Sequence, residues 1–330
     1  MIVSRTPFRI SFFGGGTDYQ EWAKKNGGKV LSTSIDKYCY ISIRKLPPFF
    51  SHKHRIVYSD IENVNSLDEI KHPSVRETLK FYKIKDGLEI HHDGDLPARS
   101  GLGSSSSFTV GLINALHALK GERTNKDFLA KNAINIEQNI IKENVGSQDQ
   151  VAVAYGGFNS IDFTTDKSFV VNPFIIGQKQ LSHFKSHLLL FFTGFTRIAS
   201  SIAKDQLDRI QENEKNLSEI KDMVYEAEKI LKNPNEIRLF GKLLDQSWKI
   251  KKSLSNNVSN KLIDDAYEAA INCGALGGKI LGAGGGGFIL IFAEPHKHRK
   301  IKKTLESFVN VPFDFDNTGS QIALYQPEGF

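Results

Sequence analysis

The 330-residue sequence contains only two cysteines, Cys39 and Cys273, which lie far apart in apolar or helical surroundings. Two isolated cysteines supply neither a disulfide framework nor the clustered thiolates of a metal site. The sequence also lacks a hydrophobic run approaching the ~20 apolar residues that span a bilayer, and it does not begin with the charged-then-apolar order of a signal peptide. We therefore expect a cytoplasmic protein without a membrane segment, whose cysteines stay reduced in the core.

Long lysine and arginine runs interleaved with aromatic residues are also missing, although the net charge is +6. This balance argues against nucleic acid as a partner and favours small anionic ligands, which need only a local basic site. The hydrophobic share of 40% and the charged share of 24% are ordinary for a globular protein. A chain of this length forms one large domain or two smaller ones.

The residue pattern predicts mixed strands and helices, with no internal repeat. In the first half, strands are expected at 2–5, 9–13, 30–34, 39–44, 56–58 and 88–91, and helices at 19–25, 73–80, 105–120 and 125–142. Further strands are expected at 157–163, 169–171, 188–192 and 288–292, and a helical region at 198–272. A weak boundary near 179–185 divides the chain into domains 1–182 and 183–330.

Residues 97–107 read Pro-Ala-Arg-Ser-Gly-Leu-Gly-Ser-Ser-Ser-Ser and lie between an expected strand and an apolar helix. A glycine loop before a helix N-terminus binds anions, because free backbone N–H groups and the helix dipole face the ligand. Glycine permits positive φ and close approach of the backbone, and serine hydroxyls add donors or a magnesium ligand. A flexible linker or a single serine cap leaves most of these residues unexplained.

A second glycine run, Gly-Ala-Gly-Gly-Gly-Gly at 282–287, matches G-x-G-x-x-G. A strand follows it, whereas a dinucleotide fold requires a helix there, so we reject that interpretation. The sequence also contains no G-x-x-x-x-G-K-[ST] motif and none of the protein-kinase signatures. A tight turn, direct ligand contact and close approach of another loop stay open for this run.

A third segment, residues 7–19, runs from a strand through three glycines to Thr17 and Asp18. These two residues either cap a helix or contact a hydroxylated substrate, with Arg9 as an anion contact.

A fourth segment, Gly-Ser-Gln-Asp-Gln at 146–150, places Asp149 after the expected helix that carries Glu137. Phosphoryl transfer needs oxygen ligands for a metal and a group that positions or deprotonates the attacking hydroxyl. Two carboxylates beside the anion-binding loop predicted at 97–107, called the phosphate loop below, suit these roles.

In this order and spacing, the Gly/Ser motifs resemble those of the GHMP kinase superfamily, which includes galactokinase, homoserine kinase, mevalonate kinase and phosphomevalonate kinase. Residues 97–106 match its P-x-x-x-G-L-G-S-S loop, 7–18 its N-terminal motif and 281–288 its C-terminal motif. The resemblance implies an α+β GHMP kinase fold of two domains, the first similar to ribosomal protein S5 domain 2 and the second ferredoxin-like. It also implies an active site between them and ATP- and Mg²⁺-dependent phosphorylation of a small-molecule hydroxyl.

The resemblance also implies roles for matching residues. Asp149 and Arg9 would act in catalysis, Asp149 as a base or only to orient the hydroxyl, and Ser105 and Glu137 would hold Mg²⁺. The expected ATP-binding residues are Pro97, Arg99, Ser100, Gly101, Leu102, Gly103, Ser104, Ser105 and Ser106. The expected substrate-binding residues are Gly14, Gly15, Gly16, Thr17, Asp18, Lys37, Arg197, Gly284 and Gly285.

The glycines at 14–16 replace the Gly-Glu-His of galactokinases, which removes an acidic and a ring contact to the sugar. The sequence of this segment and of residues 34–40 and 95–103 is similar to that of bacterial D-glycero-D-manno-heptose 7-phosphate kinases. The kinase domain of bifunctional fucokinases is the next most similar. The resemblance implies transfer to the anomeric O1, giving heptose 1,7-bisphosphate for nucleotide-activated heptose biosynthesis. A sugar phosphate needs a second anion site, for which the candidates are Lys37, Arg44, Arg99 and Arg197.

Two alternatives stay open. One is a fucokinase- or galactokinase-like anomeric kinase acting on an unphosphorylated sugar, and the other is a non-catalytic sugar or nucleotide sensor. The expected partners are thus small molecules, ATP and a sugar phosphate, and the chain is expected to be a monomer or a homodimer.

Overall fold

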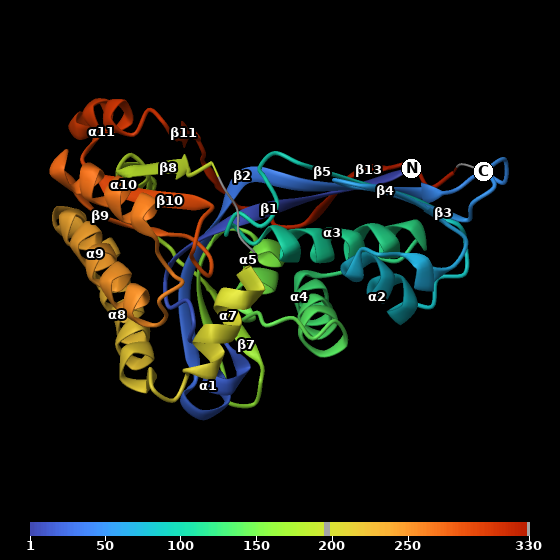
Figure 1. Ribbon diagram of the computed structural model, residues 1–330, viewed down its shortest axis with the longest axis horizontal. Coiled ribbons are helices and arrows are strands. Elements are labelled where there is room, and N and C mark those ends of the chain that lie inside the picture. The colour runs from blue at the N-terminus through green and yellow to red at the C-terminus, as the bar shows by residue number, and fades with distance from the viewer. Residues whose placement is uncertain (195–198, 329–330) are drawn as a thin grey trace.

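The computed structural model describes residues 1–194 and 199–328, which form two units side by side (Figure 1). The first unit is a long sheet with helices on one face, at the right of Figure 1. The second unit, at the left, is a smaller sheet with its own helices. The predicted two-domain α+β arrangement is confirmed. Within these ranges, no helix is long and apolar enough to cross a bilayer.

Two long strands, β1 (Ile2–Phe13) and β2 (Gly28–Lys45), form the centre of the first sheet. The sequence predicts two short strands in each segment, but the structure joins them. Pro7 does not end β1, because the register shifts there: Pro7 lies opposite Tyr38, and Phe8 lies opposite Ile35. Such a bulge bends the strands, so that different parts of β2 pair with different neighbours.

The sheet has the strand order β13-β1-β2-β5-β3-β4. Strands β5 (Leu88–Gly94), β3 (His54–Val57) and β4 (Ile61–Val64) extend it beyond one half of β2, whereas β6 (Phe158–Phe163) and β7 (Phe169–Pro173) extend it beyond the other half. Strand β4 was not predicted, because its pattern is inverted: Ile61 is exposed and Glu62 is buried. The buried carboxylate accepts hydrogen bonds from Tyr58, Lys71 and His72.

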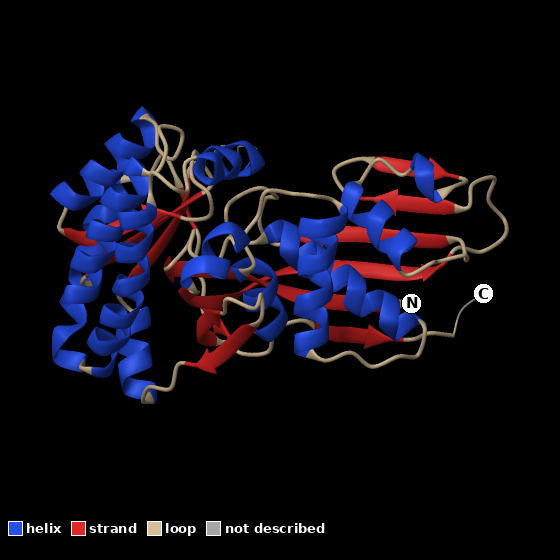
Figure 2. Cartoon of the chain, turned by 90° about the horizontal axis from the view of Figure 1, so that it is seen from below, coloured by secondary structure: helices blue, strands red, loops and turns tan. Residues whose placement is uncertain are grey.

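Helices cover one face of this sheet, and the view from below shows them lying over its strands (Figure 2). They are α2 (Pro73–Phe81), α3 (Ser104–Leu119), α4 (Lys126–Ile134) and α5 (Gln148–Tyr155), while α1 (Gln20–Asn26) and η1 (Leu67–Glu69) are short connecting helices. The predicted helix at 125–142 changes into a π-helical turn, η2 (Asn135–Ile140), which carries Glu137. Such turns are rare and are frequent at functional sites.

The second unit has the strand order β11-β8-β10-β9, built from β8 (Leu188–Phe192), β9 (Ala275–Ile280), β10 (Phe288–Ala293) and β11 (Val309–Asn310). All neighbours are antiparallel, and their order along the chain is 4-1-3-2, as expected for a ferredoxin-like domain. Its helices are α6 (Gln178–Lys185), α7 (Ala199–Asp208), α8 (Glu214–Lys232), η3 (Pro234–Glu236), α9 (Ile237–Ser253), α10 (Lys261–Asn272), η4 (Pro295–Lys297) and α11 (His298–Thr304).

The end of the chain returns to the first sheet. Strand β12 (Phe315–Asp316) pairs with β2, and β13 (Gln321–Tyr325) pairs with β1 as an edge strand. The division into 1–182 and 183–330 stays a prediction, and these two strands lie in the predicted second domain but pair in the first sheet.

An aromatic cluster joins the two units. Phe12 of β1 is fully buried, and its ring lies 5.5 to 6.4 Å, centroid to centroid, from four phenylalanine rings of β6, α6, α9 and β12. These are Phe158, Phe184, Phe240 and Phe315. Each such pair adds about 0.5–1.5 kcal/mol to the burial of the rings. The cluster therefore fixes the end of β1 against the second unit.

Replacing Phe12 with alanine should lower the free energy of unfolding by about 3–5 kcal/mol, because it leaves a cavity where both units meet. Urea denaturation measures this loss. The same truncation at Phe81, which is 41% exposed on α2, is the matched control and should cost far less. Equal losses in the two variants would show that the aromatic cluster does not hold the units together.

Candidate active site

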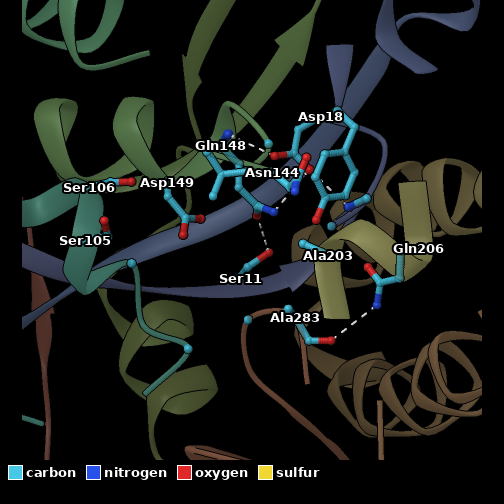
Figure 3. A pocket seen from close by; sticks show the side chains of 18 of the residues that line it. Ser11, Asp18, Ser105, Ser106, Asn144, Gln148, Asp149, Ala203, Gln206 and Ala283 are labelled. Atoms are coloured by element: carbon cyan, nitrogen blue, oxygen red, sulfur yellow. Dashed lines mark hydrogen bonds between the residues drawn. The ribbon is translucent and has the colours of Figure 1, made fainter. Parts of the chain in front are cut away.

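A cavity of about 310 Å³ lies where the two units meet (Figure 3). The first unit contributes the end of β1 and the turn after it, the loop before α3, and residues 143–149. The second unit contributes residues of α7, α9, β9 and the second glycine run. The predicted motifs therefore meet at one place, although they are far apart in the sequence.

The loop before α3 has an unusual backbone. Arg99, Gly101 and Gly103 have φ values of 57°, 84° and 78°, in the left-handed region that glycine adopts at little cost. Gly103 is the N-cap of α3, and its carbonyl accepts the first backbone hydrogen bond of the helix, from Ser107 N–H at 2.8 Å. The helix therefore begins directly at the cavity, where its first N–H groups and its dipole favour an anion.

The four serines at the start of α3 have different surroundings. Ser104 Oγ accepts the Arg99 N–H at 3.0 Å, Ser106 Oγ donates to Glu137 at 3.0 Å, and Ser107 Oγ donates to the Pro7 carbonyl at 2.8 Å. Ser105 is exposed, and its hydroxyl has no partner among the described residues. Three serines thus hold the loop in shape, and Ser105 keeps its hydroxyl available for a ligand.

Arg9 and Asp149 form a two-bond ion pair at the wall of the cavity. Arg9 Nε and Nη2 each donate to one carboxylate oxygen at 2.8 Å, and Nη1 donates to the Gly101 carbonyl at 2.6 Å. The arginine is 2% exposed, whereas the Asp149 side chain is 27% exposed. Asp149 lies in the first turn of α5, where the helix dipole favours a carboxylate. This bidentate geometry orients Asp149 and ties it to the phosphate loop.

Asp18 lies across the cavity from this pair in a network of hydrogen bonds (Figure 3). Its carboxylate accepts the backbone N–H groups of Gly16 and Gln148, both at 3.0 Å, and the Gln148 side-chain amide at 3.2 Å. Gln148 Oε1 in turn accepts the Ser11 hydroxyl at 2.7 Å. Burial, together with the nearby Asp149 charge, raises the pKa of Asp18 to about 6. The network presents polar groups suited to the hydroxyls of a substrate.

Glu137 lies behind the phosphate loop and does not line the cavity. It is fully buried, and its Oε2 accepts hydrogen bonds from Ser106 and Gln150, while Oε1 has no partner in the described part of the chain. Burial raises the pKa of this carboxyl to about 7.

The described residues contain no cluster of three or more His, Cys, Asp or Glu suited to a metal ion. Mg²⁺ does not need one, because it commonly binds through one or two protein oxygens together with water and substrate phosphates. The free Oε1 of Glu137 and the free hydroxyl of Ser105 fit this ion.

The predicted site residues divide into two groups. Those that line the cavity are Arg9, Gly15, Gly16, Asp18, Arg99, Gly101, Gly103, Ser104, Ser105, Ser106 and Asp149. Those that do not are Gly14, Thr17, Lys37, Pro97, Ser100, Leu102, Glu137, Gly284 and Gly285. Arg197 lies outside the described residues.

Several residues of the second group support the walls instead. The Thr17 hydroxyl donates to the carbonyls of Gly14 and Lys29 and thereby holds the glycine turn against β2. Gly285 N–H donates to the Val258 carbonyl at 2.8 Å, on the side of the glycine run away from the cavity. The Lys37 ammonium is bonded to Asp36.

The second glycine run packs against the phosphate loop, backbone to backbone. Phe288 N–H donates to the Ser100 carbonyl at 3.2 Å, and a Cβ added to Gly287 would lie only 2.1 Å from the same oxygen. A Cβ added to Gly101 would lie 2.4 Å from the Leu281 carbonyl oxygen. The glycines therefore permit close approach of two loops, and Gly282 and Ala283 are the only residues of this run that line the cavity.

A contribution from the second unit was predicted at Arg197, Gly284 and Gly285, but three cavity residues of this unit were not predicted. Lys251 of α9, Gln206 of α7 and Lys279 of β9 line the cavity, and Gln206 donates to the Ala283 carbonyl at 3.2 Å. The first two lie in helices rich in polar residues, where nothing distinguishes them. Lys279 had a signal, because it is the one charged residue in the Ala-Leu-Gly-Gly-Lys-Ile strand. Gln148 was also not predicted, although it lies next to Asp149 in the segment 146–150 that the sequence had singled out.

Two protein-family models match this chain. The model of the GHMP kinase N-terminal domain matches residues 71–157, and that of the GHMP kinase C-terminal domain matches residues 218–310. A D-glycero-alpha-D-manno-heptose 7-phosphate kinase of Campylobacter jejuni is 31% identical over 328 residues, covering 96% of each chain. The bifunctional fucokinase/GDP-fucose pyrophosphorylase of Arabidopsis thaliana is 25% identical over 91% of this chain and 30% of its own length.

Solved structures show the same fold. A D-glycero-D-manno-heptose 1-phosphate kinase from Bacteroides thetaiotaomicron superposes with a TM-score of 0.80 at 23% identity, over 99% of this chain and 100% of that one. A putative sugar kinase from Campylobacter jejuni superposes with a TM-score of 0.71 at 27% identity, over 97% of both chains.

A glycine- and serine-rich loop at a helix start, beside an arginine-held aspartate in a cavity between the two units, is typical of an ATP-dependent small-molecule kinase. With both domain models matched, and a relative 31% identical along almost its whole length, the chain belongs to the GHMP kinase family. Its similarity to heptose phosphate kinases supports a heptose kinase role.

Replacing Glu137 with glutamine should stabilise the ligand-free protein at high pH. The folded pKa of about 7 lies above the ordinary 4.5, so the wild type loses stability as the pH rises between these values. We expect the variant to exceed the wild type by about 3 kcal/mol at pH 8 and to equal it near pH 4.5, from 1.36 kcal/mol per pKa unit.

Urea denaturation at the two pH values, without nucleotide or metal, measures this difference. Glu306→Gln, at an exposed position, is the control and should change stability little at either pH. A stability difference for Glu137→Gln that does not vary with pH would contradict the buried-charge explanation.

Proposed function

We propose that the protein transfers the γ-phosphoryl group of ATP to the anomeric O1 of D-glycero-D-manno-heptose 7-phosphate, giving the 1,7-bisphosphate for nucleotide-activated heptose biosynthesis. The observation that carries this proposal is the Arg9–Asp149 pair, which faces the same cavity as the phosphate loop. The identity of 31% with a heptose 7-phosphate kinase over 96% of both chains supports the choice of substrate.

The phosphate loop supplies the donor side of the reaction. The first N–H groups of α3 and the hydroxyls of Ser104 and Ser105 would bind the phosphates of ATP, since both serines line the cavity. Ser105 and Glu137 would hold Mg²⁺, which when bound offsets the negative charge of the phosphates. Gly101 couples this loop to the acceptor side, because its carbonyl is bonded to Arg9.

Asp149 would act on the acceptor hydroxyl. Its carboxylate is fixed by Arg9 and open to the cavity, so it can accept the O1–H and orient the oxygen toward phosphorus. As the O1–P bond forms and the bond to ADP breaks, the proton of O1 passes to Asp149. The Arg9 guanidinium, which is bonded to both Asp149 and Gly101, would lie beside the transferring group and stabilise its negative charge. An anomeric hydroxyl is more acidic than an ordinary alcohol, which eases this proton transfer.

Asp18 and Gln148 would hold the sugar. Their side chains are bonded to one another and line the cavity, and Asp18 accepts backbone N–H groups that fix its position. The turn at Gly15 and Gly16 adds no side chain to this wall, which leaves room for a long sugar.

The second candidate is an anomeric kinase for an unphosphorylated sugar, favoured by the similarity to the fucokinase. An ADP-release assay with heptose 7-phosphate, unphosphorylated heptose, fucose, galactose and mevalonate separates the candidates. We expect the highest kcat/KM with heptose 7-phosphate and a ³¹P spectrum that gains an anomeric phosphate. Turnover of unphosphorylated sugars alone would rule out the proposed substrate.

Replacing Asp149 with asparagine should lower kcat by about 10²–10⁴ and leave ATP binding largely unchanged, because the carboxylate acts on the acceptor hydroxyl. Steady-state kinetics and nucleotide titration measure the two effects. Asp127→Asn, on the exposed surface of α4, is the control and should keep wild-type kcat. Unreduced turnover in Asp149→Asn would exclude its role in the reaction.

A further inference from the structure

Two lysines of the second unit line the cavity without a carboxylate partner. The Lys279 side chain of β9 is buried, and its ammonium donates to the Phe12 carbonyl at 2.8 Å. The Lys251 ammonium of α9 donates to the carbonyls of Ile280 at 2.9 Å and Gly282 at 2.5 Å. All three acceptors are uncharged backbone oxygens, and neither lysine forms a salt bridge with a described residue.

Three other lysines show the pairing that is usual for an ammonium group. Lys29, whose side chain is 8% exposed, contacts the carboxylates of Asp162 and Glu228. On α9 itself, the exposed Lys249 contacts Asp245, and the half-buried Lys252 contacts Asp264. Lys279 is buried and Lys251 is half-buried, and an unpaired charge in such surroundings is costly, so these two exceptions require an explanation outside the ligand-free chain.

The pKa values of both lysines are lowered in the ligand-free protein. Burial lowers the pKa of Lys279 to about 7 and that of Lys251 well below its ordinary value, and the Arg9 charge lowers both further. Arg9 is neutralised by Asp149, whereas nothing on the described chain neutralises the two lysines. This end of the cavity thus disfavours the charged form of both lysines, and an anion bound beside them would favour it.

Three of the four candidates predicted from the sequence do not supply such a site, and the fourth, Arg197, lies outside the described residues. Lys37 is paired with Asp36, and Arg44 is paired with Glu89 on the far part of the sheet. Arg99 lines the cavity, but it is exposed at the loop that would bind ATP.

We propose that Lys251 and Lys279 form a phosphate-binding subsite in the wall that the second unit contributes to the active-site cavity. This inference rests on the proposed function and extends it. The phosphate comes from one of two sources: the ester that the sugar substrate already carries, or the γ-phosphoryl group of ATP. In either case the anion neutralises the pair when the substrates are bound, and the two lysines contact it directly.

Binding of inorganic phosphate provides a test that needs no turnover. With ADP present to fill the phosphate loop, we expect phosphate to raise the Tm of the wild type, and at least a tenfold weaker affinity in Lys279→Met and Lys251→Met by calorimetry. Lys249→Met, which removes an exposed charge from the same helix, should bind phosphate as the wild type does. Equal phosphate affinity in all four proteins would overturn the proposal.

The ligand-free variants give an independent readout. If a lysine is needed only for the fold, its replacement should lower the Tm. If it is an unpaired buried charge, its removal should leave the Tm unchanged or raise it. We expect Lys279→Met without phosphate to melt at or above the wild-type temperature. A large fall in Tm, together with unchanged phosphate affinity in the folded protein, would assign Lys279 to structure alone.

Steady-state kinetics distinguish the two sources of phosphate. If the subsite takes the sugar's ester, both variants should raise KM for the sugar phosphate at least tenfold, keep KM for ATP, and lose the preference over the unphosphorylated sugar. If it takes the γ-phosphoryl group, kcat should fall with either sugar and the preference should persist. Lys279→Arg should recover part of the loss. Unchanged kcat and KM for every substrate would overturn the subsite.

The two proposals fail separately. If the wild type phosphorylates no sugar phosphate but still binds phosphate through the lysines, the subsite stands and the proposed substrate is wrong. If the wild type phosphorylates heptose 7-phosphate and the variants match it in kinetics and phosphate binding, the substrate stands and the subsite is wrong.

Discussion

The active site depends on the three hydrogen bonds of a single buried side chain, Arg9. Two of them fix the Asp149 carboxylate, and the third reaches the carbonyl of Gly101 in the phosphate loop. Burial makes this arrangement rigid, because an arginine that is 2% exposed cannot exchange these partners for water without leaving an unpaired charge. In the proposed mechanism, the acceptor and donor sides of the reaction would thereby be held in one geometry before any ligand arrives, which is what positioning catalysis requires.

In the ligand-free protein, burial disfavours the charged forms of several titratable groups in the cavity and behind its wall. Burial raises the pKa of Asp18 and Glu137, and it lowers the pKa of Lys251 and Lys279. Each of these groups is thus held where its charged form is disfavoured, a cost to stability that functional sites commonly carry. Substrate hydroxyls, a cation and phosphate groups are the partners that would offset this cost. Part of the binding free energy of the substrates would therefore come from relieving the unfavourable burial of these groups.

The sequence predicted the parts of this molecule that are local and missed those that depend on distant contacts. The phosphate loop was recognisable because glycines, serines and an apolar helix follow one another in eleven residues, 97–107. The joining of short strands into β1 and β2 could not be predicted, because the bulge at Pro7 depends on how β1 pairs with its partner strand. The burial of Glu137 behind Ser106 and the two lysines of the cavity wall were equally hidden, since tertiary packing alone gives them their surroundings.

The pairing of β13 with β1 links the two ends of the chain at the strand that carries Arg9. Ile2 lies opposite Tyr325, so the edge of this sheet is completed only after residue 325 has left the ribosome. Contacts between residues so distant in sequence close late and slow folding. The same pairing brings Met1 and Gln326 together, and the Met1 amino group donates a hydrogen bond to the Gln326 carbonyl. A circular permutant that joins them and opens an exposed loop elsewhere should therefore be topologically accessible to this fold.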